Sequence, residues 1–73
     1  MSDHTYKKIE LVGSSEKSVE DAINNAVNRA AESVDNMSWF EVTEIRGHID
    51  KQKVAHYQVG LKVGFTVGDK KSS

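Results

Sequence analysis

Three side chains in the second half of the chain have the chemistry to bind a flat, polar ligand. Trp39 is the single tryptophan, and its indole could stack on an aromatic heterocycle. Gln58, in the stretch HYQVG, carries a donor and an acceptor that match the C=O and N–H groups on the edge of an imide-like ring. Arg46, in the stretch EIRG, could hold a phosphate. These residue types indicate ligand binding.

Each of these residues also has a purely structural explanation. Trp39 could fill an interface between subunits, Gln58 could be a solvated strand residue, and Arg46 could form a surface salt bridge. Stacking on one aromatic ring adds about 0.5–1.5 kcal/mol beyond area burial, whereas micromolar affinity needs about 8 kcal/mol. A useful ligand site must therefore cover both faces of the ligand, and a symmetric interface could bring a second tryptophan.

The composition excludes several classes of function. The chain has no cysteine and no nucleophile-elbow or phosphate-loop pattern, so we expect no enzymatic activity. The 10 basic and 11 acidic residues give a net charge of −1 without the basic stripe that nucleic-acid binding needs. No apolar run approaches the roughly 18 residues of a membrane span, and the first residues, MSDHTYKK, lack a hydrophobic signal core. We expect a soluble, cytoplasmic protein.

The length of 73 residues predicts a single domain, residues 1–73, with an ordered core of about 4–67 and frayed ends at 1–4 and 68–73. A domain of this size buries only about 60% of its unfolded surface, so its core is marginal. Without disulfides, oligomerisation is the expected source of additional stability.

One helix is predicted between two β-rich regions. Its apolar residues recur at helical spacing, and they are Val19, Ala22, Ile23, Ala26, Val27, Ala30 and Val34. This pattern predicts an amphipathic helix that begins at Val19 and ends near Asp35 and Asn36. Ser15 or Ser18 could cap its N-terminus.

Three strands are predicted around this helix. Residues 5–12 favour a strand that stops at a turn formed by residues 13–15. Residues 38–50 and 53–67 alternate between apolar and polar side chains, so they predict a hairpin whose turn is residues 50–53. The predicted fold is α+β, a β-α-β-β unit with a three-stranded antiparallel sheet curved around the helix. Lys51-Gln52 is not a favoured pair for a two-residue loop, so the turn type is left open.

The hairpin register places Trp39 on the sheet face away from the helix. If Lys51 and Gln52 form the loop, paired positions sum to 103, so Trp39 lies opposite Gly64 and Glu41 lies opposite Lys62 as a cross-strand ion pair. Glycine inside a strand leaves room for close approach by a ligand. The other face of the hairpin carries the apolar side chains that suit the helix, Phe40, Val42, Leu61 and Val63.

The same register separates polar residues nearer the turn. Gln58 shares the face of Trp39, whereas strict alternation puts Arg46 on the opposite face unless a bulge intervenes or a neighbouring subunit supplies the arginine. His48 and His56 also fall on opposite faces, so no two-histidine metal site is expected within one chain.

The chain resembles the dodecins, small flavin-binding proteins. The resemblance covers about residues 4–67 and rests on TYKKIELVGSS, the helix after it, WFEVTEIRGHI and HYQVGLKVGF. It implies a β-α-β-β subunit of the bacterial type that assembles into a hollow dodecamer. It further implies that Trp39 stacks on flavin and that Gln58 contacts the pyrimidine edge. Arg46 and the nearby His48 would also lie at the flavin.

The resemblance implies a storage function. Flavins in such proteins bind as stacked pairs between tryptophans of symmetry-related subunits, which leaves little room for a substrate and quenches the excited flavin. The expected cofactor is FMN, or another flavin such as riboflavin or FAD, and coenzyme A stays open as a further ligand. Two alternatives are a structural shell in which Trp39 only joins subunits, and a flavin-dependent enzyme.

Overall fold

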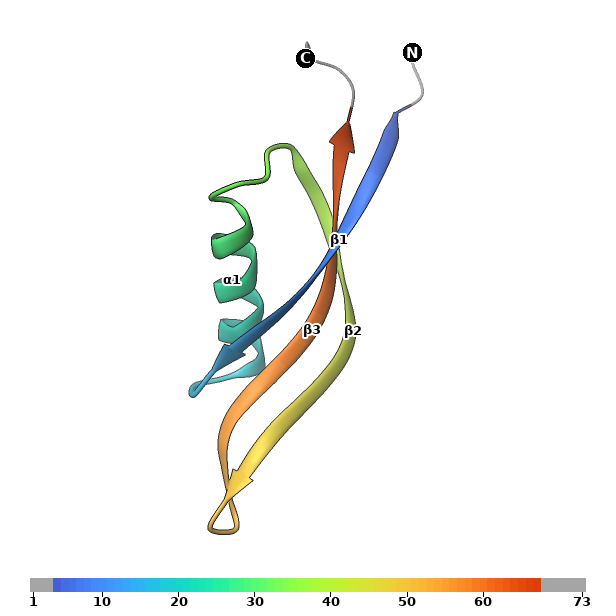
Figure 1. The fold of residues 1–73 in the computed structure, drawn as a ribbon. Coiled ribbons are helices and arrows are strands. Elements are labelled where there is room, and N and C mark those ends of the chain that lie inside the picture. Colours follow the sequence, from blue (N-terminus) through green and yellow to red (C-terminus); the bar gives the residue numbers. More distant parts are fainter. Residues whose placement is uncertain (1–3, 68–73) are drawn as a thin grey trace.

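A computed structural model of the protein describes residues 4–67. In chain order its elements are β1 (Thr5–Ser15), α1 (Val19–Ala30), β2 (Met37–Asp50) and β3 (Lys53–Val67). The three strands form one antiparallel sheet in the order β1-β3-β2, with β3 in the centre (Figure 1). The predicted β-α-β-β subunit with a three-stranded antiparallel sheet is confirmed. The chain ends predicted to fray, apart from His4, lie outside the described residues.

The helix begins at a serine cap, as predicted. The Ser18 hydroxyl accepts a hydrogen bond from the Asp21 backbone N–H at 3.0 Å. Ser15 has a different role, because its hydroxyl donates to the Asp21 carboxylate at 2.7 Å and accepts from the Lys17 N–H at 2.8 Å. The two serines thus order the connection from β1 and satisfy N–H groups at the helix start.

The helix ends at Ala30, before the predicted end near residues 35–36. The chain continues to coil for one more turn, but partly through tighter i+3 bonds, from the Glu32 N–H to the Arg29 carbonyl and from the Ser33 N–H to the Ala30 carbonyl. Asn36 then adopts a positive φ of 64° and starts the path into β2. The apolar spacing therefore extended one turn beyond the regular helix.

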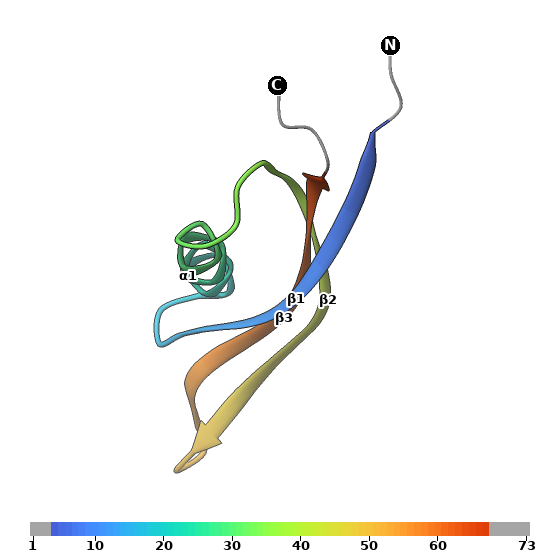
Figure 2. The ribbon, with the colours of Figure 1, turned by 45° about the horizontal axis from the view of Figure 1, so that its top comes forward.

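The core lies between α1 and the sheet. α1 packs on β1 and β3, and β2 has no comparable contact with it (Figure 2). The buried apolar side chains are Ala22, Ala26 and Ala30 of α1 with Val59, Leu61 and Val63 of β3. Gly13 permits this close packing, because a Cβ there would collide with the Ala22 carbonyl oxygen. Gly13 lies within β1, where it is paired with Val59 of β3, and the strand runs on to Ser15. The prediction of a turn at residues 13–15 is therefore wrong.

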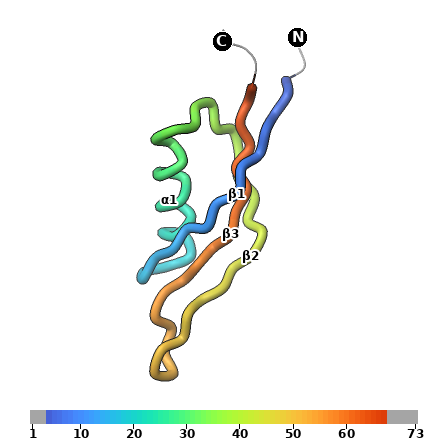
Figure 3. Tube along the Cα trace, viewed as in Figure 1, coloured from blue at the N-terminus to red at the C-terminus, as the bar shows by residue number. Residues whose placement is uncertain are grey.

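The β2–β3 hairpin extends beyond the end of the helix and curls toward the helix side (Figures 1 and 3). Its turn is where it was predicted, with Asp50 paired to Lys53. Lys51 and Gln52 have φ angles of 54° and 67°, the positive values of a type I′ turn. Because the pairing of β1 with β3 reaches only to Tyr57, the end of the hairpin is a two-stranded ribbon.

A single chain leaves much apolar surface uncovered. Its Cα radius of gyration is 15.0 Å, whereas a compact chain of this length would have about 11 Å. On the helix side of β2, Phe40 is 50% exposed and Ile45 is 60% exposed, because α1 covers the other two strands. In the single chain this apolar face of β2 therefore stays open to solvent.

Candidate functional site

Trp39 lies against the backbone of Gly64 on the sheet face away from α1. The two residues are paired across β2 and β3, and a Cβ at Gly64 would collide with three ring atoms of the indole, Cε2, Cζ2 and Cη2. The tryptophan is 40% exposed. The predicted position of Trp39 opposite Gly64 is confirmed, and the glycine allows the ring to lie close to the sheet.

Lys8 borders the tryptophan from the other side of the glycine. Lys8 is on β1 and is paired with Gly64 of β3. Its Nζ lies 5.7 Å from the centroid of the Trp39 ring and 3.9 Å from Oε1 of Glu41. Glu41 is opposite Lys62 as predicted, but the ion pair that Glu41 forms is with Lys8. The sequence did not indicate Lys8, because the pairing of β1 with β3 was not predicted.

Arg46 lies directly opposite Gln58, on the face of Trp39. The register shifts between Val42 and Glu44, which leaves Thr43 without a partner on β3. This bulge turns the following residues of β2 to the other face, so the placement by strict alternation is wrong and the bulge considered as an alternative is present. Arg46 Nε is also 3.2 Å from Oε2 of Glu44, the surface ion pair considered for it.

His48 and His56 face each other across the same pair of strands. Their ring centroids are 5.2 Å apart and the ring planes differ by only 10°. The prediction that they point to opposite faces is therefore wrong, for the same reason as for Arg46. His48 is exposed and His56 is half-buried.

The site residues fall into two groups along the outer face. Gln58, Arg46 and the two histidines lie together in adjacent rows near the hairpin end. Trp39 is opposite Gly64, six residues from Gln58 along β3, which corresponds to about 20 Å of strand. Trp39 and Gln58 of one chain are therefore well separated on the outer face.

A small cavity lies on the helix side of β2. Its volume is about 250 Å³, and its lining residues are Val27, Met37, Ser38, Trp39, Phe40 and Val63. Pockets for small-molecule ligands are typically about 300–1,000 Å³ with convergent polar groups. The apolar lining of this cavity is better suited to packing than to holding a polar ring.

Within residues 4–67 the structure contains no group of three histidine, aspartate or glutamate side chains placed to hold a metal ion. No helix among these residues is long and apolar enough to cross a membrane.

Comparison with known proteins gives consistent matches. The family model Dodecin matches residues 5–68. The dodecin of Thermus thermophilus is 53% identical over 60 residues, which are 82% of this chain and 87% of that protein. The calcium dodecin of Mycobacterium tuberculosis is 37% identical over 60 residues, 82% of this chain and 84% of that protein. The dodecin structure from Streptomyces coelicolor has a TM-score of 0.89 and 48% identity, covering 96% of this chain and 100% of that one.

Proposed function

The chain belongs to the dodecin family, and on that premise we propose that it binds flavins as stacked pairs between Trp39 side chains of symmetry-related subunits. The ligand is FMN, or riboflavin or FAD, and the protein stores flavin and limits its photochemistry. The observation that carries the proposal is the partly exposed indole of Trp39, which Gly64 allows to lie close to the open sheet face. A platform of this kind suits a planar ring system.

The polar contacts to the flavin come from another subunit than the tryptophan beneath it. Trp39 and Gln58 of one chain are about 20 Å apart along the strands. A flavin stacked on Trp39 therefore meets the amide of Gln58 from a neighbouring chain. Arg46 lies opposite Gln58 and accompanies it to the flavin, with His48 in the next row. A complete site therefore requires assembly.

The uncovered apolar face of β2 supports a homo-oligomer. Phe40, Val42 and Ile45 follow one another on this face and are 37–60% exposed. Burying them against another subunit contributes about 25 cal/mol per Å² of apolar surface removed from water. The proposed number of twelve subunits rests on the dodecin family.

Storage rather than turnover follows from the proposed geometry. Two flavins stacked on each other and enclosed by two tryptophans expose little of the reactive ring to a substrate. An indole in contact with the isoalloxazine can also donate an electron to its excited state and take it back. Light absorbed by the flavin is then dissipated without chemistry.

The experiment is a titration of flavin fluorescence with flavin-free protein, with the particle mass read by size exclusion on the same sample. We expect strong quenching, about one flavin per chain, and a particle near twelve chains. Trp39→Ala should keep the particle and weaken flavin binding by about tenfold or more, the loss of about 1.4 kcal/mol. A colourless wild-type particle that falls apart on Trp39→Ala would instead support the structural shell.

Gln58 gives a second, finer test. A net hydrogen bond is worth about 0.5–1.5 kcal/mol, so Gln58→Ala should weaken binding less than Trp39→Ala. Gln58→Glu keeps the shape of the side chain but replaces its N–H donor by an acceptor, so this variant should bind flavin more weakly than Gln58→Ala does. Equal flavin affinity of the wild type, Gln58→Ala and Gln58→Glu would show that Gln58 is not part of the site. Steady oxidation of a reductant by the flavin-loaded protein would contradict the storage function. Adding coenzyme A to the flavin titration tests whether coenzyme A is a further ligand, because a ligand of the same site would compete with flavin.

A further inference from the structure

We propose that His48 and His56 form a two-histidine clip for a divalent transition-metal ion, with Zn²⁺ as the probe. The imidazoles come from paired positions of β2 and β3, with centroids 5.2 Å apart and planes within 10° of parallel. Each histidine is two residues from Arg46 or Gln58 on its own strand, with the Gly47–Tyr57 pair between, so the four side chains share one face of the sheet. The clip is formed within one chain and does not depend on bound flavin.

The nitrogen ligands of the two imidazoles determine which metal ions the clip can bind. Imidazole nitrogen is a good ligand for Zn²⁺, Ni²⁺ and Cu²⁺, whereas Ca²⁺ takes oxygen ligands. In the stacked arrangement the ring planes are nearly parallel, and imidazole nitrogen donates in the plane of its ring. Both side chains must therefore change rotamer, so that one nitrogen of each ring converges on a shared ion. Because the described residues place no third histidine or carboxylate with this pair, water completes the coordination shell. The site therefore binds moderately and exchanges its ion.

The location gives the clip a structural consequence. β1 pairs with β3 only as far as Tyr57, so the rows beyond it consist of β2 and β3 alone. The register also shifts between His48 and Ile49, which interrupts the pairing next to the histidines. The helix lies farther along the sheet and gives this end no cover (Figure 3). A two-stranded ribbon is marginally stable by itself, so an ion that joins His48 to His56 stabilises the end of the hairpin.

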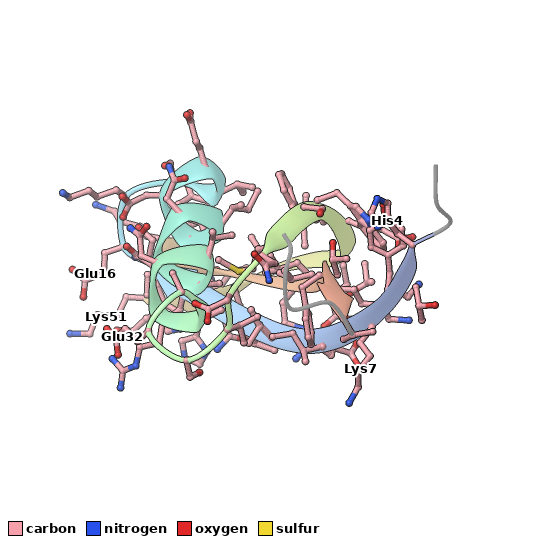
Figure 4. The ribbon with its side chains drawn as sticks, turned by 90° about the horizontal axis from the view of Figure 1, so that it is seen from above. His4, Lys7, Glu16, Glu32 and Lys51 are labelled. Carbon is pink, nitrogen blue, oxygen red and sulfur yellow. The ribbon has the colours of Figure 1, made fainter. Side chains whose placement is uncertain are left out.

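The test is calorimetric titration of Zn²⁺ into the assembled, flavin-free protein. We expect about one ion per chain for the wild type. His48→Gln and His56→Gln should each lower the affinity by about 100-fold, because a single imidazole loses the gain from intramolecular binding of the second. His4→Gln is the matched control, and this variant should bind Zn²⁺ as the wild type does. His4 immediately precedes β1 and lies on the opposite side of the molecule from the helix (Figure 4).

A second measurement separates the clip from unspecific binding. Saturating Zn²⁺ should slow amide hydrogen exchange at the end of the hairpin in the wild type and in His4→Gln, but not in either clip variant. Ca²⁺ should neither bind nor compete. Wild-type affinity in His48→Gln or His56→Gln, or no Zn²⁺ binding by the wild type at millimolar ion, would overturn the proposal. Since the protein is flavin-free in this test, its outcome is independent of the flavin titration.

Discussion

Gly64→Ala tests the proposed flavin platform without changing a side chain that touches the ligand. The Cβ of an alanine at this position would occupy the space of Cε2, Cζ2 and Cη2 of the Trp39 indole. Because this Cβ is fixed to the central strand, the ring has to move. Trp39 is 40% exposed, so it can swing outward into solvent without unfolding the sheet. The variant should therefore fold and assemble but present its tryptophan in the wrong place.

The size of the effect follows from the value of one stacking contact. Stacking of a heterocyclic base on an aromatic side chain contributes about 1–3 kcal/mol by alanine substitution. This range corresponds to roughly fivefold to 150-fold in affinity. We expect Gly64→Ala to fall within it and to approach the loss caused by Trp39→Ala.

Gly60→Ala is the matched control, because Gly60 is the other glycine of β3 on the same face. A Cβ at Gly60 would lie 3.1 Å from Oγ1 of Thr43 and 3.3 Å from Cγ of Glu44, two side chains that can move by the few tenths of an ångström required. Its flavin affinity should stay within about threefold of the wild type, which is less than 1 kcal/mol. The assay is again flavin fluorescence with the particle mass measured in parallel.

Two outcomes would refute the reasoning. If Gly64→Ala binds flavin as tightly as the wild type in an intact particle, contact between the indole and the Gly64 backbone is not needed for the site. If Gly60→Ala loses as much affinity as Gly64→Ala, the effect belongs to any alanine in β3 and not to the tryptophan. The emission maximum of Trp39 in the flavin-free variants gives an independent reading, since displacement should shift it only in Gly64→Ala.

Two further predictions concern stability. Leu61→Ala removes a side chain with 0% exposure from the contact between α1 and β3, so it should lower the free energy of unfolding by about 2–5 kcal/mol; denaturation at fixed protein concentration measures this, and a loss below 1 kcal/mol would contradict the assigned core. Ser18→Ala removes the hydroxyl that accepts from the Asp21 N–H and should cost about 1 kcal/mol. Ser33→Ala, at an exposed serine after the helix, should change stability by less than about 0.5 kcal/mol, and an equal effect of both would argue against the cap.

The β2–β3 register shows why one site residue was placed correctly and others were not. Paired positions sum to 103 at the turn, to 104 from His48–His56 to Glu44–Gly60, and to 103 again from Val42–Leu61 to Trp39–Gly64. The two shifts cancel, so Trp39 meets Gly64 as simple counting predicts. Arg46 and His48 lie between the shifts and therefore change faces. The alternation of side chains gives no local signal for either shift, because both strands keep their β-favouring residues.

The sequence by itself determined the elements and the face of the tryptophan. Apolar spacing placed the start of α1 at Val19, alternation placed β3 at residues 53–67, and the hairpin turn placed Trp39. These are consequences of local periodicity, which a single chain segment carries. The tertiary structure decided the rest. Gly13 is in a strand because it pairs with Val59 of β3, Lys8 is beside Trp39 because β1 pairs with β3, and the two histidines are together because of a bulge. Contacts between segments far apart in sequence, and the register shifts that adjust them, depend on how the whole sheet packs.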